Sequence, residues 1–237
     1  MVEETVSIKS FADQLETAVA NEETAETAAI VKTISDHQAA GPVVAELGKR
    51  LTAQGANSEK RTITAYALNA MNEVEAVHHL GKYLSDTRHD IDLRTTILGL
   101  LQKNFTHHPI ETLTYVRQVL DKAEPQFRIR AQATFEFAIT QTVAHETLSP
   151  RKILLDAGIK PSHLKPALLK KVENLDGAAI PVPSIFAEAL GHLKDQESVD
   201  LLCQLLHIYQ SEQLAEEQEA LSGNGRSLDE SPQKGQI

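Results

Sequence analysis

The sequence predicts an all-α fold, a right-handed α–α superhelix of stacked antiparallel helix pairs. The first observation is an internal repeat, in which residues 44–51 (VAELGKRL) match residues 77–84 (VHHLGKYL) at an offset of 33. The second is that the Arg-Thr dipeptide at 61–62 recurs at 94–95 with the same offset. A period in the thirties, with one amphipathic run before a turn and another after it, is typical of stacked helix pairs.

A third, looser copy follows 36 residues after the second. In it Arg130 takes the place of Arg94. The apolar positions of 77–84 recur there as Leu113, Val116 and Leu120. A single pair of this kind cannot bury its own apolar face, so the core must lie between neighbouring pairs. Leu98, in a run that is apolar over most of its circumference, is therefore expected to be buried between repeats.

Changes in periodicity predict five segments. Residues 1–41 are expected to form an irregular helical cap, 42–141 three helix pairs, and 142–183 an irregular helical segment where prolines and glycines interrupt the period. The pattern returns in 184–219, which we expect to form further helices of the repeat type. Residues 220–237 are small and polar without periodicity and are predicted to be a disordered tail.

Several local features carry structural expectations. Ser10, with an acid three residues later, predicts the N-cap of the first helix, and Ser58 predicts that of the second helix in the first repeat. The second helix of the cap is rich in small residues that permit close helix approach, at Ala25, Ala28 and Ala29. Three glycines inside helical patterns are best explained by close packing between pairs, because Gly costs about 1 kcal/mol against Ala in a helix. They are Gly48, Gly81 and Gly191.

Composition narrows the function classes. The net charge of −10 and the isoelectric point near 5.5 oppose binding to phosphate backbones. An aromatic content of 4% without tryptophan also argues against stacking platforms for nucleic-acid bases. No apolar run approaches membrane-spanning length, and the first residues carry acids where a signal peptide carries basic residues. We therefore expect a soluble cytoplasmic protein that binds neither nucleic acid nor membrane.

The single cysteine excludes an internal disulfide and a thiolate metal cluster. Cys203 lies in the apolar run Leu201–Leu206, so it is expected to be buried rather than reactive. The same run could pack on a second copy of the chain, and we expect a monomer or a homodimer.

In three places a hydrophobic triplet is followed by a polar turn and a basic residue, here Arg61, Arg94 and Arg130. With this pattern the chain resembles HEAT-repeat proteins over residues 42–141, and a second stretch similar to a repeat runs from 184 to 210. The resemblance implies an armadillo-like α-solenoid. It also implies that these arginines cap neighbouring turns, although binding of an anionic partner is the alternative reading of the column.

The histidines suggest an alternative function, in which the protein binds a metal ion. Imidazole is a common neutral metal ligand, and the HEAT-like deoxyhypusine hydroxylases hold iron with His-Glu pairs on successive repeats. The residues available for such a site here are His79, His108, His145 and Glu146. The first two stand 29 residues apart, about one helical turn short of the repeat, and His108 is expected in the loop before Pro109.

No nucleophile elbow and no phosphate-binding glycine loop occurs in the sequence. The leading hypothesis is therefore a non-catalytic scaffold, adaptor or chaperone-like protein without cofactor, which binds a protein or peptide along one face of the solenoid. Because the chain is acidic, the partner is expected to carry a basic patch. A metal-dependent enzyme on the same scaffold is the alternative.

Overall fold

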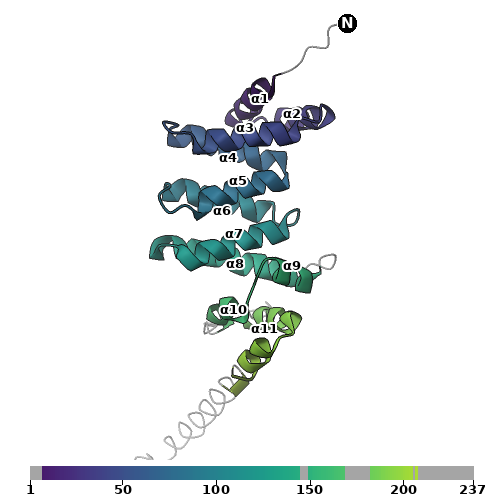
Figure 1. The fold of residues 1–237 in the computed structure, drawn as a ribbon, viewed down its shortest axis with the longest axis vertical. Helices are drawn as coiled ribbons and strands as arrows, with labels where there is room; N and C mark the ends of the chain where they lie inside the picture. Colours follow the sequence, from purple (N-terminus) through teal and green to yellow (C-terminus); the bar gives the residue numbers. More distant parts are fainter. Residues whose placement is uncertain (1–6, 145–148, 169–181, 205, 208–237) are drawn as a thin grey trace, which may run out of the picture.

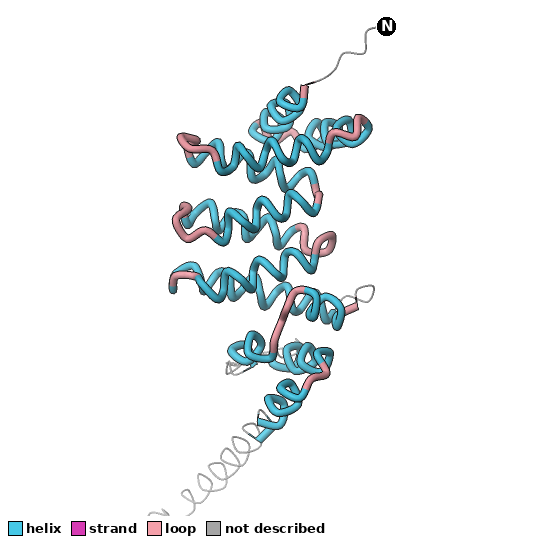
Figure 2. Tube along the Cα trace, viewed as in Figure 1, coloured by secondary structure: helices cyan, strands magenta, loops and turns pink. Residues whose placement is uncertain are grey.

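The computed structural model describes residues 7–144, 149–168, 182–204 and 206–207, and every regular element in that part of the chain is a helix (Figure 2). The helices are α1 (Ile8–Ala20), α2 (Thr24–Asp36), α3 (Ala40–Thr52), α4 (Ser58–Met71), α5 (Val74–Ser85), α6 (Ile91–Lys103), α7 (Pro109–Lys122), α8 (Pro125–Ala144), α9 (Pro150–Asp156), α10 (Pro161–Leu168) and α11 (Val182–Leu193). A further helix, residues 196–204 and 206–207, follows α11 and is called the C-terminal helix below. The predicted tail, 220–237, lies outside the described residues.

The helices form a stack in which each pair lies on the next (Figure 1). One column runs through α3, α5, α7 and α9, and a second column through α4, α6, α8 and α11, with successive members of each column in contact. The predicted all-α stack of antiparallel helix pairs is therefore confirmed. The short helices α9 and α10 fall in the stretch where the sequence loses its period, yet α9 still contacts α7 and α11 still contacts α8.

The core is a single cluster of apolar side chains that runs through the stack from Phe11 in α1 to Leu201 in the C-terminal helix. Its middle is α6, which buries apolar residues on several sides, and Leu98 there is only 2% exposed, as predicted. Apolar side chains are therefore buried both within pairs and between them, and the burial between pairs joins them into one stack.

Two of the three helical glycines accept an aromatic or imidazole ring from the following repeat. A Cβ on Gly48 would collide with the ring of His79, and one on Gly81 would collide with the ring of Tyr115. These contacts join α3 to α5 and α5 to α7, which confirms close packing at both glycines. Gly191 is different, because a Cβ there would meet no atom within 4 Å. The packing explanation is wrong for that residue.

Four other expectations are corrected. Helix α1 begins after Ser7, and Ser10 lies inside it, where its hydroxyl accepts a hydrogen bond from Gln14. Helix α4 is capped by Asn57, whose side-chain oxygen accepts from the Lys60 amide at 2.8 Å, so Ser58 is the first helical residue. The small residues of α2 face outward, since that helix buries only one side chain, Ile34, and Ala25, Ala28 and Ala29 are exposed.

Cys203 is also exposed, contrary to prediction. The apolar run Leu201–Leu206 is amphipathic rather than uniformly buried. Leu201 faces the core at 7% exposed, whereas Leu206 is 60% exposed. A continuous apolar run does not reveal which side of a helix is covered, because only neighbouring elements decide that.

Replacing Leu98 with alanine tests the core between repeats. We expect Leu98→Ala to lower the free energy of unfolding by about 2 to 5 kcal/mol, because it removes buried methyl groups and leaves a cavity. Urea denaturation followed by circular dichroism measures the change. The control is Ile129→Ala, since Ile129 in α8 is 74% exposed, and its effect should stay within about 0.5 kcal/mol. Equal effects would place Leu98 outside the core.

Alanine at glycine positions tests the ring contacts. Gly81→Ala should destabilise the protein by about 1 to 3 kcal/mol, because the methyl group meets the base of the Tyr115 ring and the neighbour must shift. Gly99 occupies a similar interior place in α6 but has open space around it. Gly99→Ala should therefore stabilise the protein by about 0.5 to 1 kcal/mol through helix propensity. If both changes stabilise, the ring does not rest on Gly81.

Candidate functional site

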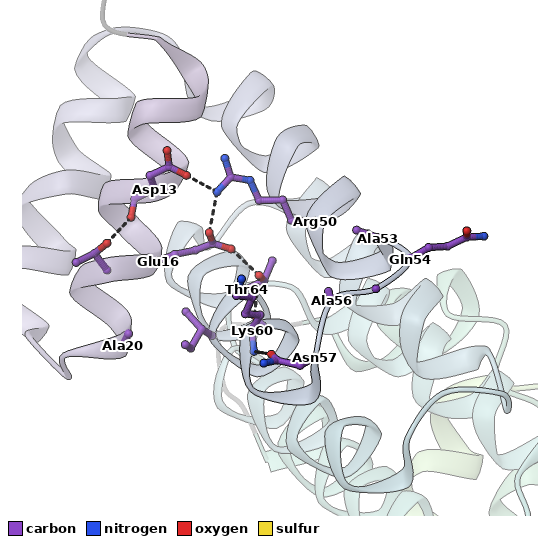
Figure 3. A pocket seen from close by; sticks show the side chains of 13 residues that line it. Asp13, Glu16, Ala20, Arg50, Ala53, Gln54, Ala56, Asn57, Lys60 and Thr64 are labelled. Atoms are coloured by element: carbon purple, nitrogen blue, oxygen red, sulfur yellow. Dashed lines mark hydrogen bonds and ion pairs between the residues drawn. The ribbon is translucent and has the colours of Figure 1, made fainter.

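A groove lies at the N-terminal end of the stack, between α1 and the turn that joins α3 to α4 (Figure 3). Its volume is about 740 Å³, within the range usual for ligand sites. It is lined by Asp13, Glu16, Thr17, Ala20, Arg50, Ala53, Gln54, Gly55, Ala56, Asn57, Lys60, Ile63 and Thr64. These residues come from three helices and one turn, so the groove exists only when the first repeat is docked on the cap.

Arg50, in the last turn of α3, holds one wall of the groove. Its guanidinium donates hydrogen bonds to Asp13 at 2.6 Å, to Glu16 at 2.7 Å and to Glu46 at 3.2 Å. Burial alone would lower the pKa of Arg50, but these three hydrogen bonds outweigh it and raise the pKa above its ordinary value. Arg50 therefore stays charged and fixes α1 against α3.

Glu16 is held on both of its oxygens. Oε2 accepts from Arg50, and the Thr64 hydroxyl of α4 lies 2.5 Å from Oε1. The carboxylate is 21% exposed, so it is a fixed part of the wall. Asp13 differs, because its side chain is 66% exposed and only Oδ1 contacts Arg50 (Figure 3). Among the described residues, Asp13 Oδ2 has no side-chain partner.

The charged residues that line the groove balance one another. Asp13 and Glu16 carry two negative charges, and Arg50 and Lys60 carry two positive charges, whereas Glu46, the third carboxylate paired with Arg50, does not line the groove. The C-terminal ends of α1 and α3 border the groove as well, and helix C-termini carry partial negative charge. Apolar surface is present beside the charges at Ala20, Ala53, Ala56 and Ile63.

The arginines that the sequence aligned do not form one surface column. Arg94 is 2% exposed; it donates to the Leu84 carbonyl at 3.1 Å and to the Glu124 carboxylate at 3.0 Å. Its guanidinium carbon also lies 4.1 Å from the centre of the Phe127 ring. Hydrogen bonds from its own backbone amide and from Arg94 lower the pKa of Glu124, which keeps the pair ionised. Arg94 is thus a bridge between repeats that no partner can reach.

The other two arginines differ from Arg94 and from each other. Arg61 donates to the Ala53 carbonyl at 3.0 Å, which caps the end of α3 much as Arg94 caps the end of α5. Arg130 is exposed on α8 and makes neither contact. The looser third repeat therefore aligned a surface residue with a buried one.

The histidines named for the metal alternative have separate surroundings. His79 packs on Gly48, with its Nε2 3.8 Å from the Glu75 carboxylate, and burial lowers its pKa. His108 precedes α7, and its Nε2 lies 3.0 Å from the Asn72 carbonyl. His145 and Glu146 lie outside the described residues. Within the described ranges, no three His, Cys, Asp or Glu side chains are grouped so that they could hold a metal ion.

The groove residues were missed at the sequence level. The only signal was the i, i+3 spacing of Asp13 and Glu16, which places both acids on one face of α1. Nothing in the periodicity indicates that Arg50 meets them, because the cap precedes the first repeat and has no copy with which to align.

Removing the guanidinium tests the wall of the groove. Arg50→Met should lower the free energy of unfolding by about 1 to 3 kcal/mol, because three carboxylates lose a charged hydrogen-bond donor. The control is Arg88→Met: Arg88 is 87% exposed and pairs only with Asp86 in the same turn, so we expect no measurable change. Urea denaturation compares the two variants. A loss for Arg88→Met equal to that for Arg50→Met would refute the assignment.

The comparisons with known proteins agree with this architecture. Residues 183–207 match the family model of the PBS lyase HEAT-like repeat. No curated protein and no solved structure matches the chain significantly. Among the described residues, no helix is long and apolar enough to cross a membrane. The match covers α11 and the C-terminal helix, in the segment where the sequence had indicated a return of the repeat. The chain is therefore a stack of helix pairs, of which residues 183–207 are similar to a HEAT-like repeat.

Proposed function

We propose that this protein is a non-catalytic interaction scaffold that holds a protein or peptide partner, and that the groove between α1 and the α3–α4 turn receives a basic side chain of that partner. The observation that carries the proposal is the Asp13 carboxylate. It is 66% exposed at the mouth of the groove and has one oxygen free of side-chain contacts among the described residues. HEAT-like repeats provide extended surfaces suited to this role.

The groove suits a lysine or arginine in two respects. The exposed carboxylate of Asp13 favours a cation, and the adjoining Ala20, Ala53 and Ile63 offer apolar surface to the aliphatic stem of such a side chain. Arg50 supports the arrangement because it holds Glu16 and Asp13 in place before the partner arrives. Preorganised groups reduce the entropy that binding must overcome.

Charge also favours association at a distance. With a net charge of −10, the chain attracts a partner with a basic patch, and that attraction weakens as salt screens it. We place binding in the cytoplasm, where a protein with one exposed free cysteine stays reduced. The metal-dependent alternative gains no support from a shared position of His79 and His108, so it is not developed further.

The test uses two variants, each of which removes a single negative charge. Asp13→Asn keeps the shape of the groove and removes the exposed carboxylate, whereas Glu75→Gln removes an acid of similar exposure from α5, away from the groove. Partners captured from a lysate by the wild-type protein are identified, and the contact is mapped by chemical cross-linking. We expect Asp13→Asn to weaken capture by about tenfold, the scale of one charge-assisted hydrogen bond, and Glu75→Gln to leave it unchanged.

Synthetic peptides from the mapped region of the partner sharpen the result. Replacing the docked lysine with norleucine, or the docked arginine with citrulline, should weaken binding to the wild-type protein but not to Asp13→Asn. Equal losses in both proteins would show that the basic side chain binds elsewhere. Cross-links that avoid α1 and α4 would exclude the groove.

A further inference from the structure

The groove between α1 and the α3–α4 turn has one available group of each charge. The Arg50 guanidinium is occupied by three carboxylates, and the two oxygens of Glu16 contact Arg50 and Thr64. The Asp13 carboxylate keeps Oδ2 without a side-chain partner in the described chain. Lys60 is the other available group. Within the described ranges its hydrogen bonds use only its backbone, and its ammonium group has no partner.

The sequence around Lys60 explains why its ammonium group stays available. A lysine on a helix pairs with acids three or four residues away, and none of the positions 56, 57, 63 and 64 holds an acid. Glu59 is adjacent in the sequence, but neighbouring residues on a helix point about 100° apart. Glu16, on the facing helix α1, is already held by the chain. A partner for Lys60 therefore has to come from another molecule.

The two available groups lie at the ends of one row of contacts. Asp13 bonds to Arg50, Arg50 bonds to Glu16, and Glu16 contacts Thr64. Thr64 and Lys60 are four residues apart on α4, about 6 Å along the helix axis. Figure 3 shows the five side chains in this order, with Asp13 and Lys60 at opposite ends. The groove therefore has a negative end and a positive end, separated by groups that satisfy one another.

We propose that the groove binds a peptide segment of mixed charge, in which a lysine or arginine meets Asp13 and a nearby aspartate or glutamate meets Lys60. This inference rests on the proposed function and deepens it by assigning a second charge to the partner. A basic side chain alone would add another cation to a groove that already holds Lys60. A segment with both charges complements both ends.

Lys60 contributes to specificity in this arrangement. A segment of consecutive basic residues would bring a like charge to the Lys60 ammonium group, and such repulsion disfavours the wrong partner. The net charge of −10 attracts basic segments in general. Lys60 distinguishes among them, because it favours those with an acid beside the basic residue.

The first experiment identifies ligands without a known partner. A phage-displayed library of random twelve-residue peptides is selected against the full-length wild-type protein and against Lys60→Met, Asp13→Asn and Lys82→Met. Lys82 is an exposed lysine of α5 outside the groove and serves as the control. Circular dichroism checks that each variant is folded. We expect the wild-type protein and Lys82→Met to enrich peptides with a basic and an acidic residue. Selection on Lys60→Met should keep the basic residue and lose the acid, whereas selection on Asp13→Asn should lose the basic residue.

The outcomes separate this inference from the proposed function. Equal enrichment of the acid by Lys60→Met, or a wild-type preference for consecutive basic residues, would overturn the inference alone, provided that Asp13→Asn still loses the basic residue. Peptides that ignore Asp13→Asn, or a wild-type selection without enrichment, would overturn the proposed function and this inference together.

The second experiment measures the contact with Lys60 in the most enriched peptide, by fluorescence anisotropy. Replacing the acid of the peptide with its amide should weaken binding to the wild-type protein about two- to fivefold, the scale of an exposed ion pair. The same replacement should leave binding to Lys60→Met unchanged and should weaken binding to Lys82→Met as it does for the wild type. Equal losses with the wild-type protein and Lys60→Met would mean that the acid contacts another residue, and the inference would be wrong.

Discussion

Each helix pair in this chain has an apolar face that only the next pair can cover, and the rest of the structure depends on that constraint. It explains why the core is one continuous cluster along the stack and why α6, with neighbours on several sides, buries Leu93, Ile97, Leu98, Leu100 and Leu101. It also explains where polar residues are tolerated. They gather at the turns, as at the α3–α4 turn, and on the outward sides of helices. Stability in such a stack is a sum of nearest-neighbour interfaces.

Apolar contact alone does not fix how one helix pair is aligned along the next, because apolar contacts are not directional. Arg94 fixes the alignment of the two pairs. Its guanidinium is buried, and its contacts with water are replaced by a carbonyl of its own pair, a carboxylate of the next pair and the face of Phe127. Such a residue is satisfied in only one alignment of the two pairs, because a shift would leave a buried charge without partners. At the end of the stack, Arg50 has a related role in a partly buried setting, where its partner Asp13 remains exposed to solvent.

The sequence predicted the fold well wherever it repeats. The 33-residue offset located α3 to α6, and the glycines at 48 and 81 located the tightest contacts, because a repeated residue identifies a repeated environment. Prediction failed where one environment was inferred from composition alone. The alanines of α2, Cys203 and Gly191 sit in apolar or helical sequence, but whether they are covered depends on neighbours that composition does not specify. The groove was missed for the same reason, since Asp13 and Arg50 are 37 residues apart with no repeat to relate them.

The ring that rests on each glycine has a consequence for how this chain can change over generations. The contact of His79 with Gly48 and that of Tyr115 with Gly81 are the same packing arrangement at two successive interfaces, with the glycine in one unit and the ring in the next. A deletion or duplication of one whole period therefore brings a ring of the same kind onto a glycine of the same kind. At this contact a change in the number of units requires no new packing, whereas the ion pair of Arg94 with Glu124 is not reproduced by Arg61 or Arg130, so a unit that carries it is not interchangeable with the others.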